Sequence, residues 1–198
     1  MSFIIFYDLE TTGLNPYHNK IIEVAGIKYS TEKKKIIGEF RELVNPKTPI
    51  SSFITNLTGI TNQMVENKDT IDNVITRFIQ FCGENNVYLV SHNNDGFDKL
   101  FLENIVEYRK IIHKIHFIDT LKLAKKLINN RKSYSLKNLC NYANITYENA
   151  HRALVDAKLL YKLYRFLISE NHSDLEYLNE NDMNHPEHVK KFLYEYIL

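Results

Sequence analysis

The order of apolar segments predicts an α/β domain built on a mixed β-sheet. Three strand-like segments come first, at residues 2–9, 21–29 and 36–44, and strand-like and helical segments alternate after them. Three successive strands form an antiparallel meander, and the later alternation adds strands separated by helices. The length of 198 residues fits one such domain with a short appendage.

The first three strands differ in their surroundings. Residues 2–9 are apolar at nearly every position, which is typical of a strand buried on both faces in the middle of a sheet. Thr11-Thr12-Gly13 ends this strand. The polar segment 30–35, which contains three lysines, predicts a solvated hairpin tip between the second and third strands.

The rest of the chain begins after a break at Asn45-Pro46 and Pro49. Apolar residues at helical spacing predict a helix over residues 71–81. The elements expected after it are strands at 87–91 and 115–118 and helices at 97–108, 121–127, 136–142 and 152–168.

The C-terminal segment differs in composition from the rest. Residues 169–184 are polar and acidic, as in a linker, and Pro186 opens a short amphipathic helix. This helix either packs back on the domain or docks on a partner. We therefore expect a domain over residues 1–168 and an appendage over residues 169–198.

Composition limits the possible partners and location. The 25 Lys and Arg residues against 24 Asp and Glu leave a net charge of +1, without the strongly basic character of proteins that wrap nucleic acid. Two cysteines exclude a disulfide scaffold. The apolar N-terminus is too short for a signal peptide, and no run reaches the ~18 residues of a membrane helix. We expect an intracellular protein, cytoplasmic or nuclear, that is neither secreted nor membrane-bound.

A local basic patch is nevertheless present. Residues 99–137 contain ten Lys and Arg residues against three acidic ones. Tyr134 and Tyr142 offer stacking faces for single-stranded bases in the same region. The alternative is a solvated basic surface unrelated to any substrate.

Asp8 and Glu10 are the first candidates for chemistry. Side chains alternate along a strand, so these two carboxylates project from one face at the strand end. Two carboxylates ~4 Å apart repel by about 4 kcal/mol at an effective dielectric constant near 20. The pair therefore requires a metal ion or a basic partner, unless Glu10 turns out to solvent.

Asp98 lies in a second polar turn, between a strand and the first turn of a helix. An aspartate there is stabilised by backbone N–H groups whether or not it binds a ligand, and Asp95 is interpreted in this way. Asp98 follows the apolar Phe97 and is the better candidate for a ligand.

The third candidate pair is His151 and Asp156, at the start of the longest predicted helix. Five residues correspond to about 140° around a helix, so His151 must lie in the preceding loop to reach the same site as Asp156. The positive helix end there favours the neutral imidazole of a general base. Asp156 is surrounded by apolar residues, and a carboxylate in that position is costly unless it is liganded.

Three motifs in this order resemble those of the DEDDh (DnaQ-like) 3′–5′ exonucleases: Asp8 to Gly13, His92 to Asp98, and His151 to Ala157. Connecting segments at 21–25, 44–46, 57–61, 118–121 and 135–140 are similar to proofreading exonuclease domains of bacterial replicative polymerases. The resemblance covers residues 3–168.

This resemblance implies a ribonuclease-H-like fold with a five-stranded mixed sheet and a site for two divalent cations, Mg²⁺ or Mn²⁺. By similarity, Asp8 bridges both ions, and Glu10 and Asp156 hold the ion that binds the attacking water. Asp98 supports the second ion, and His151 is the general base. Paired cations at such sites stabilise both the attacking and the leaving oxygen.

Similarity also implies a set of substrate-binding residues. Thr11, Thr12, Gly13 and Leu14 line the pocket for the terminal nucleotide, and His92 and Asn93 shape the strand exit. His92 has an alternative role as a structural loop histidine. Asp119 is interpreted as a helix N-cap, and Glu23 either supports the site from a neighbouring strand or simply packs in its own.

The predicted function is metal-dependent release of nucleoside 5′-monophosphates from single-stranded or frayed 3′ ends. DNA is favoured over RNA, and the protein is expected to be a stand-alone nuclease or a separate subunit beside a polymerase or other replication partner. The alternatives are an exoribonuclease and a non-catalytic exonuclease-fold binding subunit. A haloacid dehalogenase-type phosphatase is disfavoured because none of the six glycines precedes an aspartate.

Overall fold

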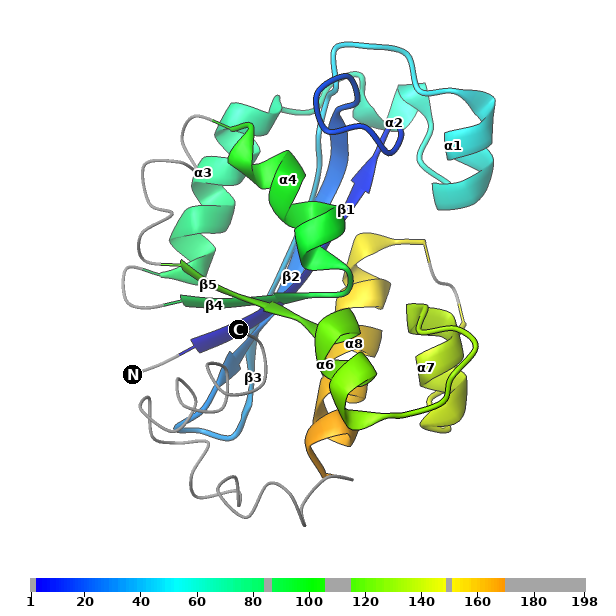
Figure 1. Cartoon of the computed structure of the whole chain (residues 1–198). Helices are drawn as coiled ribbons and strands as arrows, with labels where there is room; N and C mark the ends of the chain where they lie inside the picture. The colour runs from blue at the N-terminus through cyan, green and yellow to red at the C-terminus, as the bar shows by residue number, and fades with distance from the viewer. Residues whose placement is uncertain (1–2, 84–86, 106–114, 149–150, 170–198) are drawn as a thin grey trace.

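A five-stranded mixed sheet forms the centre of the molecule, shown in the computed structural model of Figure 1. Its strand order is β3-β2-β1-β4-β5. The strands are β1 (Phe3–Thr11), β2 (Ile21–Ser30), β3 (Lys35–Leu43), β4 (Val87–Ser91) and β5 (Ile115–Asp119). The residues that the structure describes are 3–83, 87–105, 115–148 and 151–169.

Strand β1 lies in the middle of the sheet and joins its two halves. It pairs antiparallel with β2, which pairs antiparallel with β3, and this gives the predicted meander. On its other side β1 pairs parallel with β4, which pairs parallel with β5. The predicted α/β fold with a five-stranded mixed sheet is therefore confirmed.

Helices cover both faces of this sheet (Figure 1). Helices α3 and α4 pack on one face, and α6, α7 and α8 pack on the other. The helices are α1 (Ser52–Thr58), α2 (Asn62–Val65), α3 (Ile71–Cys82), the 3-10 turn η1 (Asn94–Gly96), α4 (Asp98–Glu103), α6 (Thr120–Leu127), α7 (Leu136–Tyr142) and α8 (Ala153–Ser169).

The alternation of side chains along β1 decides which face carries the polar groups. Ile5, Tyr7 and Leu9 pack against α3 and α4. Ile4 and Phe6 belong to the core beneath α6, α7 and α8. Because side chains of a strand repeat every second residue, the even-numbered positions that follow Phe6 also face α8. The strand continues to Thr11, two residues beyond its predicted end.

Helix α8 is held against β1 by aromatic contacts. The Phe6 ring meets those of Tyr161 and Tyr164 edge to face, both at 5.3 Å between centroids. Leu163 and Leu167 are fully buried in the same core. These contacts fix the helix, and so its N-terminal end, relative to β1.

Two predictions about helices differ from the structure. The helix expected over 97–108 ends at Glu103, and the Asn104 side chain donates a hydrogen bond to the Pro16 carbonyl at 3.0 Å. Residues 106–108 of the predicted span lie outside the described residues. Helices α1 and α2 were not predicted, because α2 has only four residues and α1 buries only Ile54 and Thr58, so neither has a marked apolar face. Their local signals are present: Ser51 caps α1, and Gly59 ends it with φ of 72°.

Of the appendage expected over residues 169–198, only Ser169 is described, as the last residue of α8, and the rest lies outside the described residues, so the domain division remains a prediction. Among the described helices, none is both long and apolar enough to cross a membrane.

We predict that Leu163→Ala lowers the free energy of unfolding by about 2–5 kcal/mol, because a fully buried leucine leaves a cavity between α8 and the sheet. The matched control is Leu57→Ala on α1, where the side chain is 42% exposed, with an expected loss below about 1 kcal/mol. Urea unfolding measures both. Equal losses would contradict the packing described for α8.

Candidate active site

Three carboxylates meet where the end of β1 faces the start of α8. Asp8 and Glu10 project from β1, and Asp156 lies in the first turn of α8. One carboxylate oxygen from each residue lies within 4.8 Å of the others. The alternation along β1 and the placement of α8 over that face bring together residues almost 150 positions apart.

The protein environment disfavours the charged forms of these three groups. Burial, followed by the negative charges of Asp156, Glu23 and Asp98, raises the pKa of Glu10 to about 8. Burial also raises the pKa of Asp156 to about 6 and that of Asp8 well above its ordinary value. A site that destabilises the charged forms of three carboxylates in this way is suited to binding positive charge.

Asp98 is the fourth predicted acid, and it lies beside Asp8 but outside the group within 4.8 Å. Its side chain is buried, and the Ser91 hydroxyl donates a hydrogen bond to its Oδ2. Burial raises the pKa of Asp98 to about 7, and its negative charge raises that of Asp8. Asp8 therefore interacts with all three of the other acids, Glu10, Asp156 and Asp98.

The free oxygens of these acids fit divalent cations. Among the described residues, Asp98 Oδ1 and Asp156 Oδ1 are buried without a hydrogen-bond partner. Buried polar atoms are rarely left without partners, and a carboxylate oxygen in that position requires a cation or proton. The donor set consists of oxygen atoms, which Mg²⁺ and Mn²⁺ prefer.

His151 lies just ahead of α8, in the loop position that the sequence spacing requires. Its backbone is in the left-handed region, with φ of 65°. The His151 N–H donates a hydrogen bond to Asp156 Oδ2 at 2.8 Å, and this leaves Asp156 Oδ1 free. The imidazole is exposed, so it is open to water and to a bound substrate.

Glu23 lies next to this cluster. The sequence left open whether it supports the site or only packs in its own strand. It lies directly opposite Glu10 in the β1–β2 register and is fully buried. Its carboxylate accepts hydrogen bonds from Arg41, Arg152 and the backbone N–H of Ala153.

Ser91 and Tyr147 were not singled out from the sequence. Ser91 ends β4 and binds Asp98. Tyr147 is half-buried, and burial together with the negative charge of Asp156 raises its pKa to about 12, so its phenol stays protonated. Their only sequence signal is proximity to His92 and His151, which does not reveal what a side chain contacts.

The expected nucleotide-binding residues lie in the loop that follows Glu10. The Thr11 hydroxyl donates to the Gly13 carbonyl at 2.6 Å, and the Thr12 hydroxyl accepts from the Lys20 N–H at 3.0 Å. Gly13 packs so closely on Asn19 that a Cβ would lie 2.7 Å from its Oδ1. Leu14 is 83% exposed at the loop surface, where it is free to contact a base.

His92 and Asn93 shape the turn between β4 and η1. Both His92 ring nitrogens are engaged, with Thr120 Oγ1 and with the Tyr134 carbonyl, each at 2.9 Å. Burial lowers the pKa of His92 and so favours the neutral ring. These contacts favour the structural interpretation of His92. Asn93 is exposed with φ of 64°, and its N–H donates to Asp119.

Asp119 acts as the predicted N-cap of α6, since its Oδ1 accepts a hydrogen bond from the Leu121 N–H at 2.9 Å. Part of the basic patch is neutralised nearby. Lys122 and Lys99 both pair with Asp95, and Lys99 also approaches Glu103 at 3.8 Å.

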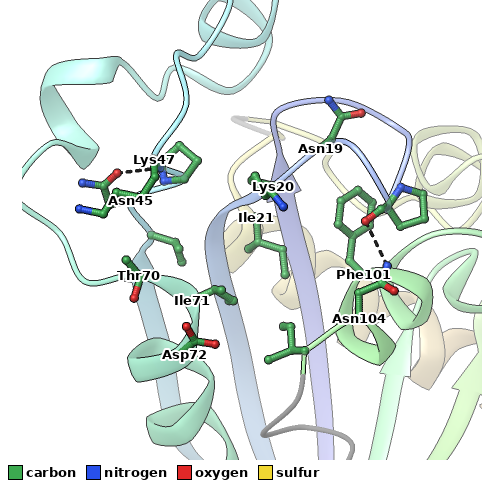
Figure 2. Close-up of a pocket in the computed structure, with 14 residues that line it drawn as sticks. Asn19, Lys20, Ile21, Asn45, Lys47, Thr70, Ile71, Asp72, Phe101 and Asn104 are labelled. Carbon is green, nitrogen blue, oxygen red and sulfur yellow. Dashed lines mark hydrogen bonds between the residues drawn. The ribbon is translucent and has the colours of Figure 1, made fainter.

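A cavity of about 320 Å³ lies between the β1–β2 loop, the start of α3 and the end of α4 (Figure 2). Its lining includes Asn19, Lys20, Asp72, Phe101 and Asn104 and none of the clustered carboxylates. The Asn104 side chain, labelled in Figure 2, donates a hydrogen bond to the Pro16 carbonyl, and this contact ties the β1–β2 loop to the end of α4.

Comparison with known proteins places these features in context. The sequence matches the RNase_T family model, described as exonuclease, over residues 5–164. It is 36% identical over 162 residues to the DNA polymerase III PolC-type of Caldanaerobacter subterraneus, and 35% identical over 185 residues to that of Bacillus subtilis. The matches include 82% and 89% of this chain but only 11% and 12% of the relatives' lengths.

Solved structures show the same fold. A zinc-bound E. coli exonuclease I–single-stranded DNA complex superposes with a TM-score of 0.74 at 22% identity, covering 89% of this chain and 42% of that chain. Exonuclease X in complex with 5′ overhanging duplex DNA has a TM-score of 0.64 at 26% identity, covering 93% of this chain and 98% of that one.

We predict that Asp8→Asn raises the melting midpoint of the metal-free protein at pH 8, because it removes a carboxylate whose pKa is raised by burial and by the neighbouring acids. An acid whose pKa is raised in the folded state makes the folded protein less stable as the pH rises. For Glu10 this loss begins above its ordinary pKa and continues up to about pH 8. The gain should therefore shrink at pH 5, where the folded cluster is protonated. Thermal melting in chelator measures it.

The control for this experiment is Glu32→Gln, an exposed acid outside the cluster, with no expected change. Excess Mg²⁺ should reverse the order and make wild type the more stable protein, since cations bind only the folded cluster. A lower midpoint for Asp8→Asn in chelator at pH 8 would show that Asp8 is structural.

Proposed function

Because this chain belongs to the RNase_T family of exonucleases, we propose that it is a metal-dependent 3′–5′ exonuclease acting on single-stranded or frayed DNA ends. The observation that carries the proposal is the cluster of Asp8, Glu10 and Asp156, with Asp98 beside Asp8. Such a concentration of acidic oxygens suits phosphodiester hydrolysis with divalent cations.

The proposed ligands divide around Asp8. Glu10, Asp156 and one side of Asp8 would hold one Mg²⁺ or Mn²⁺ ion, and Asp98 with the other side of Asp8 would hold a second. Bound cations would lower the pKa of water and stabilise negative charge on the phosphate oxygens. The unpartnered oxygens of Asp98 and Asp156 support this division.

His151 is the proposed general base. Its imidazole is exposed, and its backbone is tied to Asp156 by the 2.8 Å hydrogen bond. From this position the imidazole would act as a general base and accept a proton from the attacking water. The leaving 3′-oxygen departs with the shortened strand, and a nucleoside 5′-monophosphate is released.

The substrate end would enter beside the β1–β2 loop. Exposed Leu14 would contact the terminal base, and the backbone of the loop from Thr11 to Gly13 would approach the 3′ end. DNA is the proposed substrate because the relatives are named DNA polymerases and the similar structures contain DNA. The replicative polymerases among the relatives also suggest a replication partner.

We predict that wild type shortens a single-stranded DNA oligonucleotide from its 3′ end only when Mg²⁺ or Mn²⁺ is present. Asp8→Asn and Asp156→Asn should lower kcat by about 100-fold or more, because the cations they hold supply several kcal/mol of transition-state stabilisation. Labels at the 3′ and the 5′ end, read on a denaturing gel, distinguish the direction of digestion.

Matched RNA in the same assay tests the sugar preference, and DNA should be degraded faster. Faster loss of RNA would make the protein an exoribonuclease. Binding without degradation by wild type would identify a non-catalytic subunit. Digestion by both variants at the wild-type rate would show that the carboxylate cluster is not the active site.

We predict that His151→Ala lowers kcat by about 10²- to 10⁴-fold, the usual contribution of general base catalysis. Mn²⁺ affinity, measured by electron paramagnetic resonance, should stay close to wild type, since no imidazole is among the proposed ligands. Unchanged turnover would exclude His151 as the base, and a large loss of Mn²⁺ affinity would make it a ligand.

A further inference from the structure

We propose that Glu23 is a positioning residue for the exonuclease reaction: from β2 it fixes the start of α8, and through it His151 and Asp156. This inference rests on the proposed function. Glu23 is not proposed to touch the substrate or to ligate the cations. It would act through its contacts with the Arg152 guanidinium and the Ala153 N–H.

The start of α8 needs a cap from outside its own sequence. The first N–H groups of a helix have no partner within the helix, and a preceding Ser, Thr, Asp or Asn usually accepts one of them. Arg152 occupies that position here, and a guanidinium has no acceptor atom. Glu23 Oε2 replaces the missing cap by accepting a hydrogen bond from the Ala153 N–H at 3.0 Å.

Glu23 also holds the residue next to the general base. The Arg152 guanidinium donates from Nη2 to Glu23 Oε1 at 2.9 Å and from Nε to Oε2 at 3.3 Å. Two donors on two acceptors fix the orientation of a guanidinium as well as its position. Arg152 directly follows His151, so the anchor restrains the left-handed His151 backbone, a conformation that persists only when its surroundings enforce it.

The same anchor orients the Asp156 carboxylate. The His151 N–H donates to Asp156 Oδ2, so the loop position decides which Asp156 oxygen remains free. A loop that moved away would release Oδ2 and let the carboxylate rotate. Glu23 is therefore linked to both His151 and Asp156 through successive contacts: Glu23 binds Arg152 and Ala153, and His151, the residue before Arg152, binds Asp156.

Stability alone does not explain a carboxylate at this position. Glu23 is fully buried and lies opposite Glu10 in the strand register, so its negative charge repels the negative charges of the cluster. Like charges in directly opposed strand positions are destabilising, and buried ion pairs are often no better for stability than apolar residues. Two guanidinium groups, those of Arg41 and Arg152, are needed to balance it.

The first test compares kcat and KM for Glu23→Gln on a single-stranded DNA oligonucleotide with saturating Mg²⁺. We expect kcat to fall about 10- to 100-fold, as for other residues that orient active-site groups, with KM changed less than about twofold. Melting curves establish that the variant is folded at the assay temperature. A folded Glu23→Gln variant with wild-type kcat would overturn the proposal.

Two arginine variants separate positioning from charge balance and remain informative if Glu23→Gln does not fold. Arg152→Met breaks the contact to the loop, whereas Arg41→Met removes the other guanidinium from Glu23 and leaves the loop contact intact. We expect a clearly larger fall in kcat for Arg152→Met than for Arg41→Met. Equal falls would show that charge balance, and not loop position, is what Glu23 supplies.

The matched control is Glu39→Gln. Glu39 pairs with Lys158 at 2.8 Å, and so joins β3 to the same helix at a solvent-exposed site. Its loss should leave kcat within about twofold of wild type. A fall as large as that of Glu23→Gln would mean that any weakening of α8 lowers activity, and this outcome would also overturn the proposal.

Hydrogen exchange gives a readout that does not depend on activity. The His151 and Ala153 amides should exchange at least about tenfold faster in Glu23→Gln than in wild type, with no change in Glu39→Gln. If wild type proves inactive, the proposed function fails, but this exchange experiment still decides whether Glu23 fixes the start of α8. Unchanged exchange at both amides would overturn that contact role.

Discussion

Mutual repulsion among carboxylates is the constraint on which this structure depends. Asp8, Glu10 and Asp156 are held within a few ångströms of one another by a central strand and a long helix, with Asp98 beside them. No flexible arrangement would keep these groups together, because each would move away into water. The aromatic contacts between Phe6 and α8 therefore have a consequence beyond packing, since they oppose the separation of the acids.

The groups around the acids divide into two supports, each formed by a carboxylate outside the main cluster. Glu23 holds the start of α8. Asp119 accepts hydrogen bonds from the Asn93 and Asp95 N–H groups and caps α6, so it holds the turn that precedes Asp98. The His92 ring ties the same turn to the segment before α7, through its contact with the Tyr134 carbonyl. The start of α8 and the turn before Asp98 are thus both held by residues outside the carboxylate cluster.

The sequence predicted features that depend on local periodicity. The two-residue period of a strand placed Asp8 and Glu10 on one face, and the five-residue spacing placed His151 in the loop ahead of α8. Contacts between distant segments could not be predicted from the sequence. Glu23 binds Arg152, 129 positions away, and no local pattern around either residue indicates this contact. Helix α2 was missed because it has only four residues, and α1 was missed because it buries only Ile54 and Thr58 and so has no marked apolar face.

The tight contact between Gly13 and Asn19 restricts how the loop beside the site can evolve. Asn19 Oδ1 accepts the Asn15 N–H at 2.9 Å, a bond that closes the loop on itself, and any side chain at position 13 would occupy the space of that amide. A side chain at position 13 is therefore accommodated only if Asn19 moves or is replaced by a smaller residue. The effect of a substitution at 13 should thus depend on the residue at 19, so this loop would change at position 13 together with position 19.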